Sequence, residues 1–142
     1  MDKKTDLNER CFFLETGGRS LYCSEYIPTP TNRRKQGVIL CKPIWGERVR
    51  TVRIFVNLGR ILRDHGYHVI SCDYYGDGNS GGDTADLTFQ GMKEDTKLMH
   101  GYLSQHADLD RYALIGLRVG ANCAMGVADE IGHVDDMILI EP

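Results

Sequence analysis

Short apolar runs alternate with longer segments of helical periodicity from residue 38 onward. A continuous apolar run is typical of a strand that is buried on both faces of a parallel sheet. The runs that predict strands are residues 38–41, 68–72, 112–115 and 137–140. The segments between them that repeat apolar side chains every three or four positions, and so predict helices, are residues 49–65, 88–105 and 119–131. This order predicts an α/β fold with a mostly parallel sheet.

The first part of the chain has a different pattern. Residues 11–15 and 20–26 have strand-like composition and flank a short turn that contains Gly17 and Gly18. Glycines between two such runs are typical of a β-hairpin, so we expect two antiparallel strands before the parallel ones. Residues 1–10 are highly charged, and we expect them to be a flexible N-terminal segment.

Composition excludes several classes of function. The chain has 142 residues, 42% of them hydrophobic, with a net charge of −3 and an isoelectric point near 5.9. Nucleic-acid-binding domains usually carry a clear basic excess, so we expect no nucleic-acid partner. No run approaches the roughly 18 apolar residues of a membrane span, and the charged start does not resemble a signal peptide. We therefore expect no membrane span and a cytoplasmic location.

The five cysteines give no sign of a metal or disulfide site. They form no C-x-x-C pair, and Cys41, Cys72 and Cys123 lie inside predicted strands or a predicted helix. Such positions are typical of buried, reduced thiols. We expect neither a metal ion nor another cofactor.

Three unusual segments follow predicted strands, namely residues 42–47 (KPIWGE), 73–82 (DYYGDGNSGG) and 116–121 (GLRVGA). Ligands of open α/β sheets gather at the carboxyl ends of the strands, so we expect a site where these segments meet. Residues 73–82 match neither the dinucleotide-binding nor the P-loop glycine pattern, which argues against a phosphate cradle.

The segment GLRVGA has the glycine spacing of a nucleophile elbow. In an elbow a strand turns into a helix at one residue, which needs a positive φ there and very small residues two places before and after it. Gly116 and Gly120 supply those small residues around Arg118. The backbone N–H of Val119, at the start of the following helix, would be available to an oxyanion.

Together these segments resemble the N-terminal half of an α/β-hydrolase. The opening hairpin, KPIWGE, the D-x-x-G-x-G-x-S match that begins at Asp73 and ends at Ser80, and the elbow all occur in the order of that superfamily. The GLR-type elbow is most similar to that of the exosortase A system-associated hydrolases of the second type, which occur in bacteria that make exopolysaccharide and PEP-CTERM proteins. The resemblance implies an ester or acyl hydrolase fold, here a single partial domain over residues 1–142 that is truncated after the sixth strand.

The resemblance also assigns catalytic roles to residues of this chain, but the residue at the nucleophile position cannot perform its role. It places the nucleophile at Arg118 and the oxyanion donors at the backbone of Val119 and Ile44. A guanidinium stays protonated and has no lone pair with which to attack a carbonyl. The family's acid and histidine should follow the elbow, but His133 precedes the sixth strand, at the opposite end of the sheet. Glu141 stands where some members carry the acid; it could pair with Arg118 or be a charged residue at the end of the chain.

Other nucleophiles are weaker candidates. The resemblance makes the Ser80 hydroxyl a loop-stabilising group, and Cys123 is expected to be a buried thiol of low reactivity. We interpret His65, His68, His100 and His106 as structural. No complete catalytic set can be named, so we do not expect this chain alone to hydrolyse esters.

Three hypotheses for the function remain. In the first, the chain is a hydrolase-family protein that is either incomplete or a pseudoenzyme. In the second, it is a module that binds an acidic, acyl or ester ligand at Arg118. In the third, it is a subunit that associates through an open sheet edge. In the superfamily the sheet continues beyond the sixth strand, so an open edge would recruit a second copy, as a homodimer, or a partner chain that supplies the missing strands. Arg118 could instead form a purely structural salt bridge.

Overall fold

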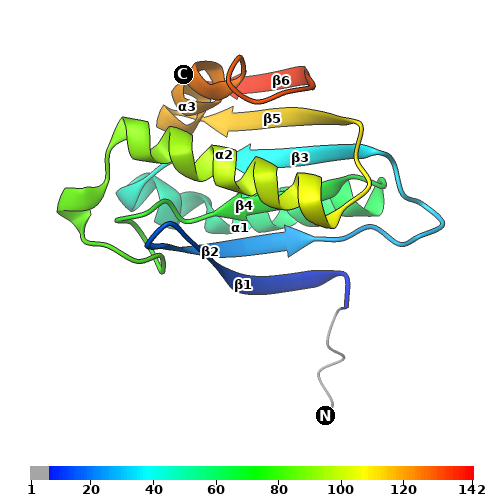
Figure 1. Cartoon of the computed structure of the whole chain (residues 1–142), viewed down its shortest axis with the longest axis horizontal. Helices are drawn as coiled ribbons and strands as arrows, with labels where there is room; N and C mark the ends of the chain where they lie inside the picture. The colour runs from blue at the N-terminus through cyan, green and yellow to red at the C-terminus, as the bar shows by residue number, and fades with distance from the viewer. Residues whose placement is uncertain (1–6) are drawn as a thin grey trace, which may run out of the picture.

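A computed structural model describes residues 7–142, which form a six-stranded sheet and the helices that cover it (Figure 1). The strands are β1 (Glu9–Thr16), β2 (Arg19–Tyr26), β3 (Gln36–Cys41), β4 (His68–Cys72), β5 (Arg111–Leu117) and β6 (Val134–Ile140). The helices are α1 (Trp45–Asp64), α2 (Phe89–His106) and α3 (Val119–Val127), with a short 3-10 helix at Thr84–Asp86. None of these helices is both long and apolar enough to cross a membrane.

The sheet confirms the predicted fold class. Its strand order is β1-β2-β4-β3-β5-β6. β1 pairs antiparallel with β2, and β2 pairs antiparallel with β4, whereas β3, β4, β5 and β6 run parallel to one another. Because the four parallel strands end at the same edge, the loops after them lie close together.

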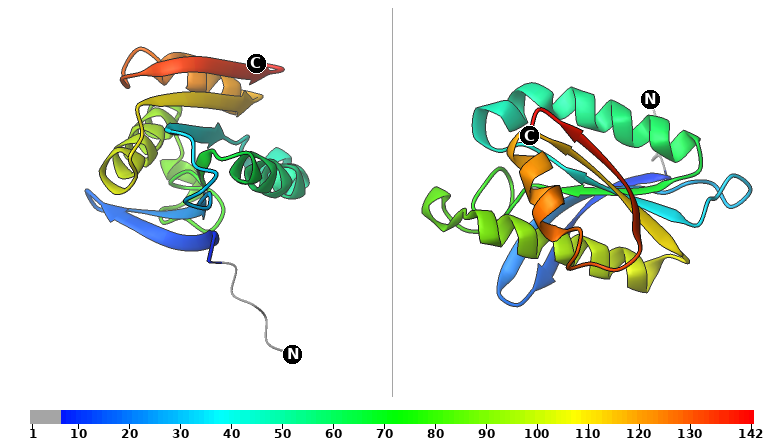
Figure 2. Two further views of the ribbon diagram at one scale, coloured as in Figure 1. Left: turned by 90° about the vertical axis from the view of Figure 1, so that its right-hand side faces the viewer. Right: turned by 90° about the horizontal axis from the view of Figure 1, so that it is seen from above.

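The helices cover the two faces of the sheet unequally (Figure 2). α1 lies on one face, where Phe55 packs on the cluster that includes Val38 and Val69. α2 and α3 lie on the other face, where Met99 and Val127 belong to the larger cluster. The core therefore has two parts, one on each side of the sheet.

Some predicted boundaries were wrong. α3 ends at Val127 instead of residue 131, and residues 128–131 form turns in which the N–H groups of Glu130 and Ile131 donate to the carbonyl of Val127. β6 begins at Val134 instead of residue 137, because its backbone already pairs with β5 there although two aspartates follow. Within the segment expected to be flexible, residues 1–10, the strand β1 already begins at Glu9, and residues 1–6 lie outside the described part of the chain.

Candidate functional site

The turn between β5 and α3 has elbow geometry. Arg118 has φ 58° and ψ −127°, and α3 begins at the next residue, Val119. A Cβ added to Gly120 would lie 2.1 Å from the carbonyl oxygen of Cys41, and one added to Gly116 would lie 2.5 Å from the Cα of Ala121. Both distances are too short for any side chain, so the close approach of strand and helix requires glycine on either side of Arg118.

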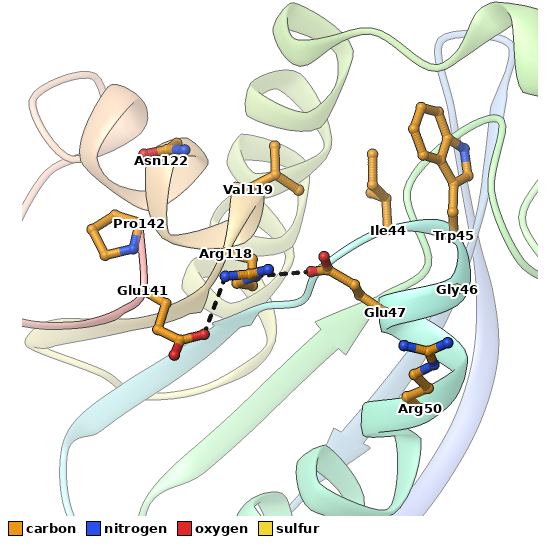
Figure 3. A pocket seen from close by; sticks show the side chains of 10 residues that line it. All are labelled: Ile44, Trp45, Gly46, Glu47, Arg50, Arg118, Val119, Asn122, Glu141 and Pro142. Carbon is orange, nitrogen blue, oxygen red and sulfur yellow. Dashed lines mark hydrogen bonds and ion pairs between the residues drawn. The ribbon is translucent and has the colours of Figure 1, made fainter.

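A pocket of about 640 Å³ lies over the elbow (Figure 3). It is lined by Ile44, Trp45, Gly46, Glu47, Arg50, Arg118, Val119, Asn122, Glu141 and Pro142. Four residues singled out from the sequence are thus brought together, namely Ile44, Arg118, Val119 and Glu141. They meet because they follow β3, β5 and β6, whose carboxyl ends share one edge of the sheet.

Arg118 lies between two carboxylates. Its Nε donates to Oε2 of Glu47 at 3.3 Å, and its Nη1 donates to Oε2 of Glu141 at 3.2 Å. The hydrogen bond to Glu47, and then the charges of Glu47 and Glu141, raise the pKa of Arg118 above its ordinary value. The side chain is half exposed, so solvent screens both ion pairs. The guanidinium therefore stays charged and cannot act as a nucleophile.

Glu47 was not identified from the sequence. It lies in the first turn of α1, and its approach to Arg118 depends on where that helix begins. Glu141 does contact Arg118, which is one of the two interpretations that the sequence left open.

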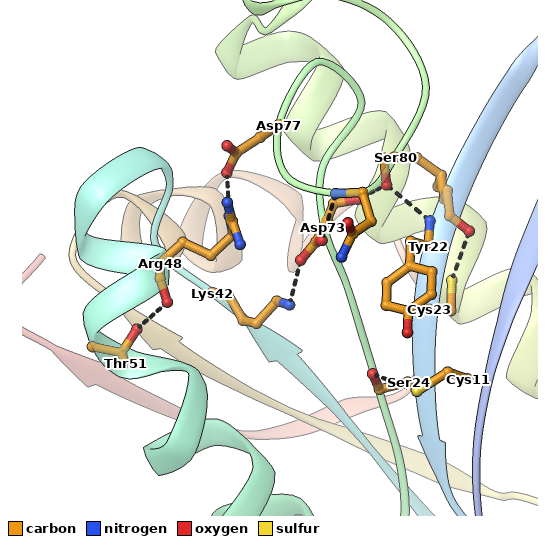
Figure 4. Close-up of polar contacts among 12 residues, drawn as sticks. Cys11, Tyr22, Cys23, Ser24, Lys42, Arg48, Thr51, Asp73, Asp77 and Ser80 are labelled. Carbon is orange, nitrogen blue, oxygen red and sulfur yellow. Dashed lines mark hydrogen bonds and ion pairs between the residues drawn. The ribbon is translucent and has the colours of Figure 1, made fainter.

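Ser80 lies in the loop after β4 and does not line the pocket (Figure 4). Its hydroxyl donates to the carbonyl oxygen of Asp73 and accepts from the N–H of Tyr22 at 2.8 Å. The Asp73 carboxylate accepts from Lys42 Nζ at 2.8 Å and from the N–H of Asn79 at 2.9 Å. The D-x-x-G-x-G-x-S segment thus uses its polar groups to close the loop onto β2 and β3.

No described histidine or cysteine lines the pocket with Arg118. The carbonyl of His133 accepts from the N–H of Tyr112, near the start of β5, so His133 lies at the opposite end of the sheet. Cys123 is buried, and burial is the largest cause that raises the pKa of its thiol. Among the residues that the structure describes, no cluster of histidine, cysteine, aspartate and glutamate could hold a metal ion.

Comparison with solved structures identifies the architecture. A serine hydrolase without a lid from Xanthomonas campestris superposes with a TM-score of 0.80 at 19% identity, over 96% of this chain and 62% of that one. This chain has the α/β-hydrolase fold. A serine hydrolase homologue from Coxiella burnetii (TM-score 0.73, 19% identity) matches 92% of this chain and 61% of its own. A thermostable carboxyl esterase from Bacillus coagulans (TM-score 0.69, 19% identity) matches 94% of this chain and 44% of its own.

The α/β-hydrolase fold is the limit of what these likenesses establish. This chain spans less than two thirds of the length of the three structures, and identity is low throughout. No protein-family model and no curated protein matches the sequence.

Proposed function

We propose that this chain is a non-hydrolytic protein of α/β-hydrolase fold that binds a small carboxylate-bearing molecule in the pocket over the elbow. The observation that carries the proposal is the identity of the side chain at the elbow tip. Arg118 puts a permanently charged guanidinium where a hydrolase needs a nucleophile, on the wall of a pocket of about 640 Å³.

The pocket has donors for a carboxylate besides those already used. A guanidinium has five N–H donors, and the ion pairs with Glu47 and Glu141 occupy one each. Val119 is the first residue of α3, and N–H groups of a first helical turn have no acceptor within their own helix. A bound carboxylate can therefore approach Arg118 from the pocket while both glutamates remain nearby.

The resemblance of the elbow to the exosortase A system-associated hydrolases of the second type extends the proposal to a ligand source. A uronic acid or an acyl carboxylate of a polysaccharide precursor has the required charge.

Replacing Arg118 with Ala is expected to weaken the binding of butyrate about 10-fold, because a charge-assisted hydrogen bond to the carboxylate is lost. Isothermal titration calorimetry would measure this, with the neutral butyramide as the control ligand. Glu141→Gln should bind butyrate more tightly than wild type, since one competing carboxylate is removed while the fold of the elbow is kept.

Two results would contradict the proposal. One is equal butyrate affinity in wild type and Arg118→Ala. The other is hydrolysis of p-nitrophenyl esters by the wild type above the background rate that persists in Arg118→Ala, which would reveal a nucleophile elsewhere.

A second candidate function, association through β6, is favoured by the exposure of that strand. β6 is an edge strand, and its side chains Ile138 and Ile140 are 54% and 46% exposed. Exposed apolar edges recruit further strands. Two copies that pair through β6 would both bring the carboxylates of Asp135 and Asp136 to the shared edge, and these are like charges. We therefore favour a partner strand with basic residues over a second copy.

Replacing Ile138 with Lys is expected to weaken such association strongly, because a positive charge on the edge strand would repel a basic partner strand and disfavour strand addition. Sedimentation velocity of the protein alone and with candidate partners would detect the change. Phe13→Lys, on the opposite edge strand β1, is the matched control and should associate as the wild type does. Association that both variants weaken equally would argue against β6 as the contact.

A further inference from the structure

We infer that Trp45 is a ligand-contacting residue, and that the carboxylate bound in the elbow pocket carries a ring with an apolar face that stacks on the indole. This inference rests on the proposed function and adds to it the class of ligand. The reasons are the backbone conformation of Trp45, the contacts that hold it, and the position of its indole.

Trp45 has an unfavourable backbone conformation. Its φ is 54°, in the left-handed region that a bulky side chain rarely occupies. Such strain persists only where neighbouring contacts impose it, and it is often found at functional sites. A glycine at position 45 would adopt this conformation at a lower energetic cost than tryptophan does. The geometry of the turn therefore does not explain why a tryptophan stands there.

A buried ion pair holds the strained residue in place. The N–H of Trp45 donates to Oδ2 of Asp77 at 3.2 Å, and the same oxygen accepts from Nε of Arg48 at 2.9 Å. Asp77 is buried, and Arg48 is largely buried beside it (Figure 4). The loop after β4 is thereby tied to the first turn of α1, and the backbone of Trp45 is held beside the pocket that it lines.

The indole is outside the core. Trp45 is 56% exposed and belongs to neither apolar cluster, although it is the single tryptophan of the chain. Tryptophan is highly buried on average, since it has a large apolar surface to remove from water. An exposed tryptophan on a strained backbone that its neighbours hold therefore has an apolar surface available for a ligand.

Most apolar and most charged side chains of the pocket lie on different sides, with Asn122 beyond Val119 and Pro142 beside Glu141 (Figure 3). The side chains of Val119, Ile44 and Trp45 follow one another along one side. The charged side chains along the other side are Glu141, Arg118, Glu47 and Arg50. A ligand that satisfies both sides has a carboxylate for Arg118 and an apolar surface that extends toward Trp45. A ring fits this description better than a flexible chain, because it loses less conformational entropy on stacking.

Titration of the wild type with butyrate, phenylacetate and glucuronate tests the inference, with phenylacetamide as the neutral control. Phenylacetate or glucuronate should bind about 3- to 10-fold more tightly than butyrate and should change the fluorescence of Trp45. Trp45→Leu, measured by calorimetry, should remove that advantage, so that the ring ligands bind no more tightly than butyrate does. Trp45→Phe should keep part of the advantage of the ring ligands. A preference for phenylacetate would indicate an aryl acid as the ligand, and a preference for glucuronate would indicate a sugar acid.

The outcomes separate this inference from the proposed function. Arg118-dependent binding of butyrate without any advantage for either ring overturns the role of Trp45 and leaves the proposed function standing. Failure of all three carboxylates to bind overturns both. Equal loss of butyrate and the ring ligands in Trp45→Leu also overturns the role of Trp45 in ring recognition, since the residue would then act on the shape of the pocket.

Discussion

Replacing Glu25 with Gln is expected to lower the free energy of unfolding by about 3 kcal/mol, because it leaves a buried charge cluster without its carboxylate. Glu25, on β2, is 2% exposed. Its carboxylate accepts from Nε of Arg10 at 2.8 Å, from Nε2 of His68 at 2.7 Å and from the hydroxyl of Tyr102 at 2.9 Å. Glutamine keeps the volume of the side chain, but it cannot supply the charge that all three donors face.

Urea unfolding would measure the loss, and Glu94→Gln is the control. Glu94 pairs with Lys97 on the surface of α2, where the ion pair is exposed to solvent, so little change is expected there. A Glu25→Gln protein as stable as the control would show that the cluster contributes no net stability.

The pH dependence of the same measurement gives a further check. Burial raises the pKa of Glu25, but hydrogen bonds from His68, Arg10 and Tyr102 outweigh burial and hold it below its ordinary value of 4.5. A group whose pKa is lowered in the folded state stabilises that state above its unfolded pKa. The difference in the free energy of unfolding between wild type and Glu25→Gln should therefore be largest near neutral pH. It should shrink as the pH falls below 4.5.

The strands could be predicted from the sequence wherever burial controls side-chain type. β3 and β4 are buried along their whole length, so apolar residues dominate both: residues 38–41 in β3, and Val69, Ile70 and Cys72 in β4. The start of β6 could not be predicted in this way. Val134 and Asp136 pair with β5 through the backbone, with Asp135 skipped at a register shift, and at this exposed edge polar side chains cost little.

The position of the candidate site was predictable because it depends on the topology of the sheet. Ile44, Val119 and Glu141 all follow parallel strands, whose carboxyl ends share one edge. The ion pairs of Glu47 and Asp77 were not predictable, since they depend on where α1 begins and how the glycine loop folds. Glu25 did leave a signal. It shares its strand face with Leu21 and Cys23, so alternation alone places its carboxylate inside, and a buried acid needs partners.

Replacing Gly120 with Ala is expected to destabilise the protein by about 3 kcal/mol or more, because a methyl group would overpack a rigid contact. Its Cβ would lie 2.1 Å from the carbonyl oxygen of Cys41 and 2.6 Å from that of Lys42. Cys41 cannot easily move away, since it ends β3 in register with Gly116 of β5. Relief of the clash would require α3 to shift away from the sheet, which would also displace Arg118.

Gly101→Ala, in α2, is the matched control. A Cβ there has no heavy atom within 4 Å, and alanine in a helix is favoured over glycine by roughly 0.5–1 kcal/mol, so this variant should be as stable as wild type or more stable. Guanidinium unfolding followed by circular dichroism compares the two. Arg118→Ser, like the control, should not be destabilised. The glycines shape the elbow, and the side chain at its tip has no part in the close contact between Gly120 and Cys41. If Arg118→Ser instead lost as much stability as Gly120→Ala, the guanidinium and its two carboxylates would be structural, and the ligand proposed for this pocket would lose its main support.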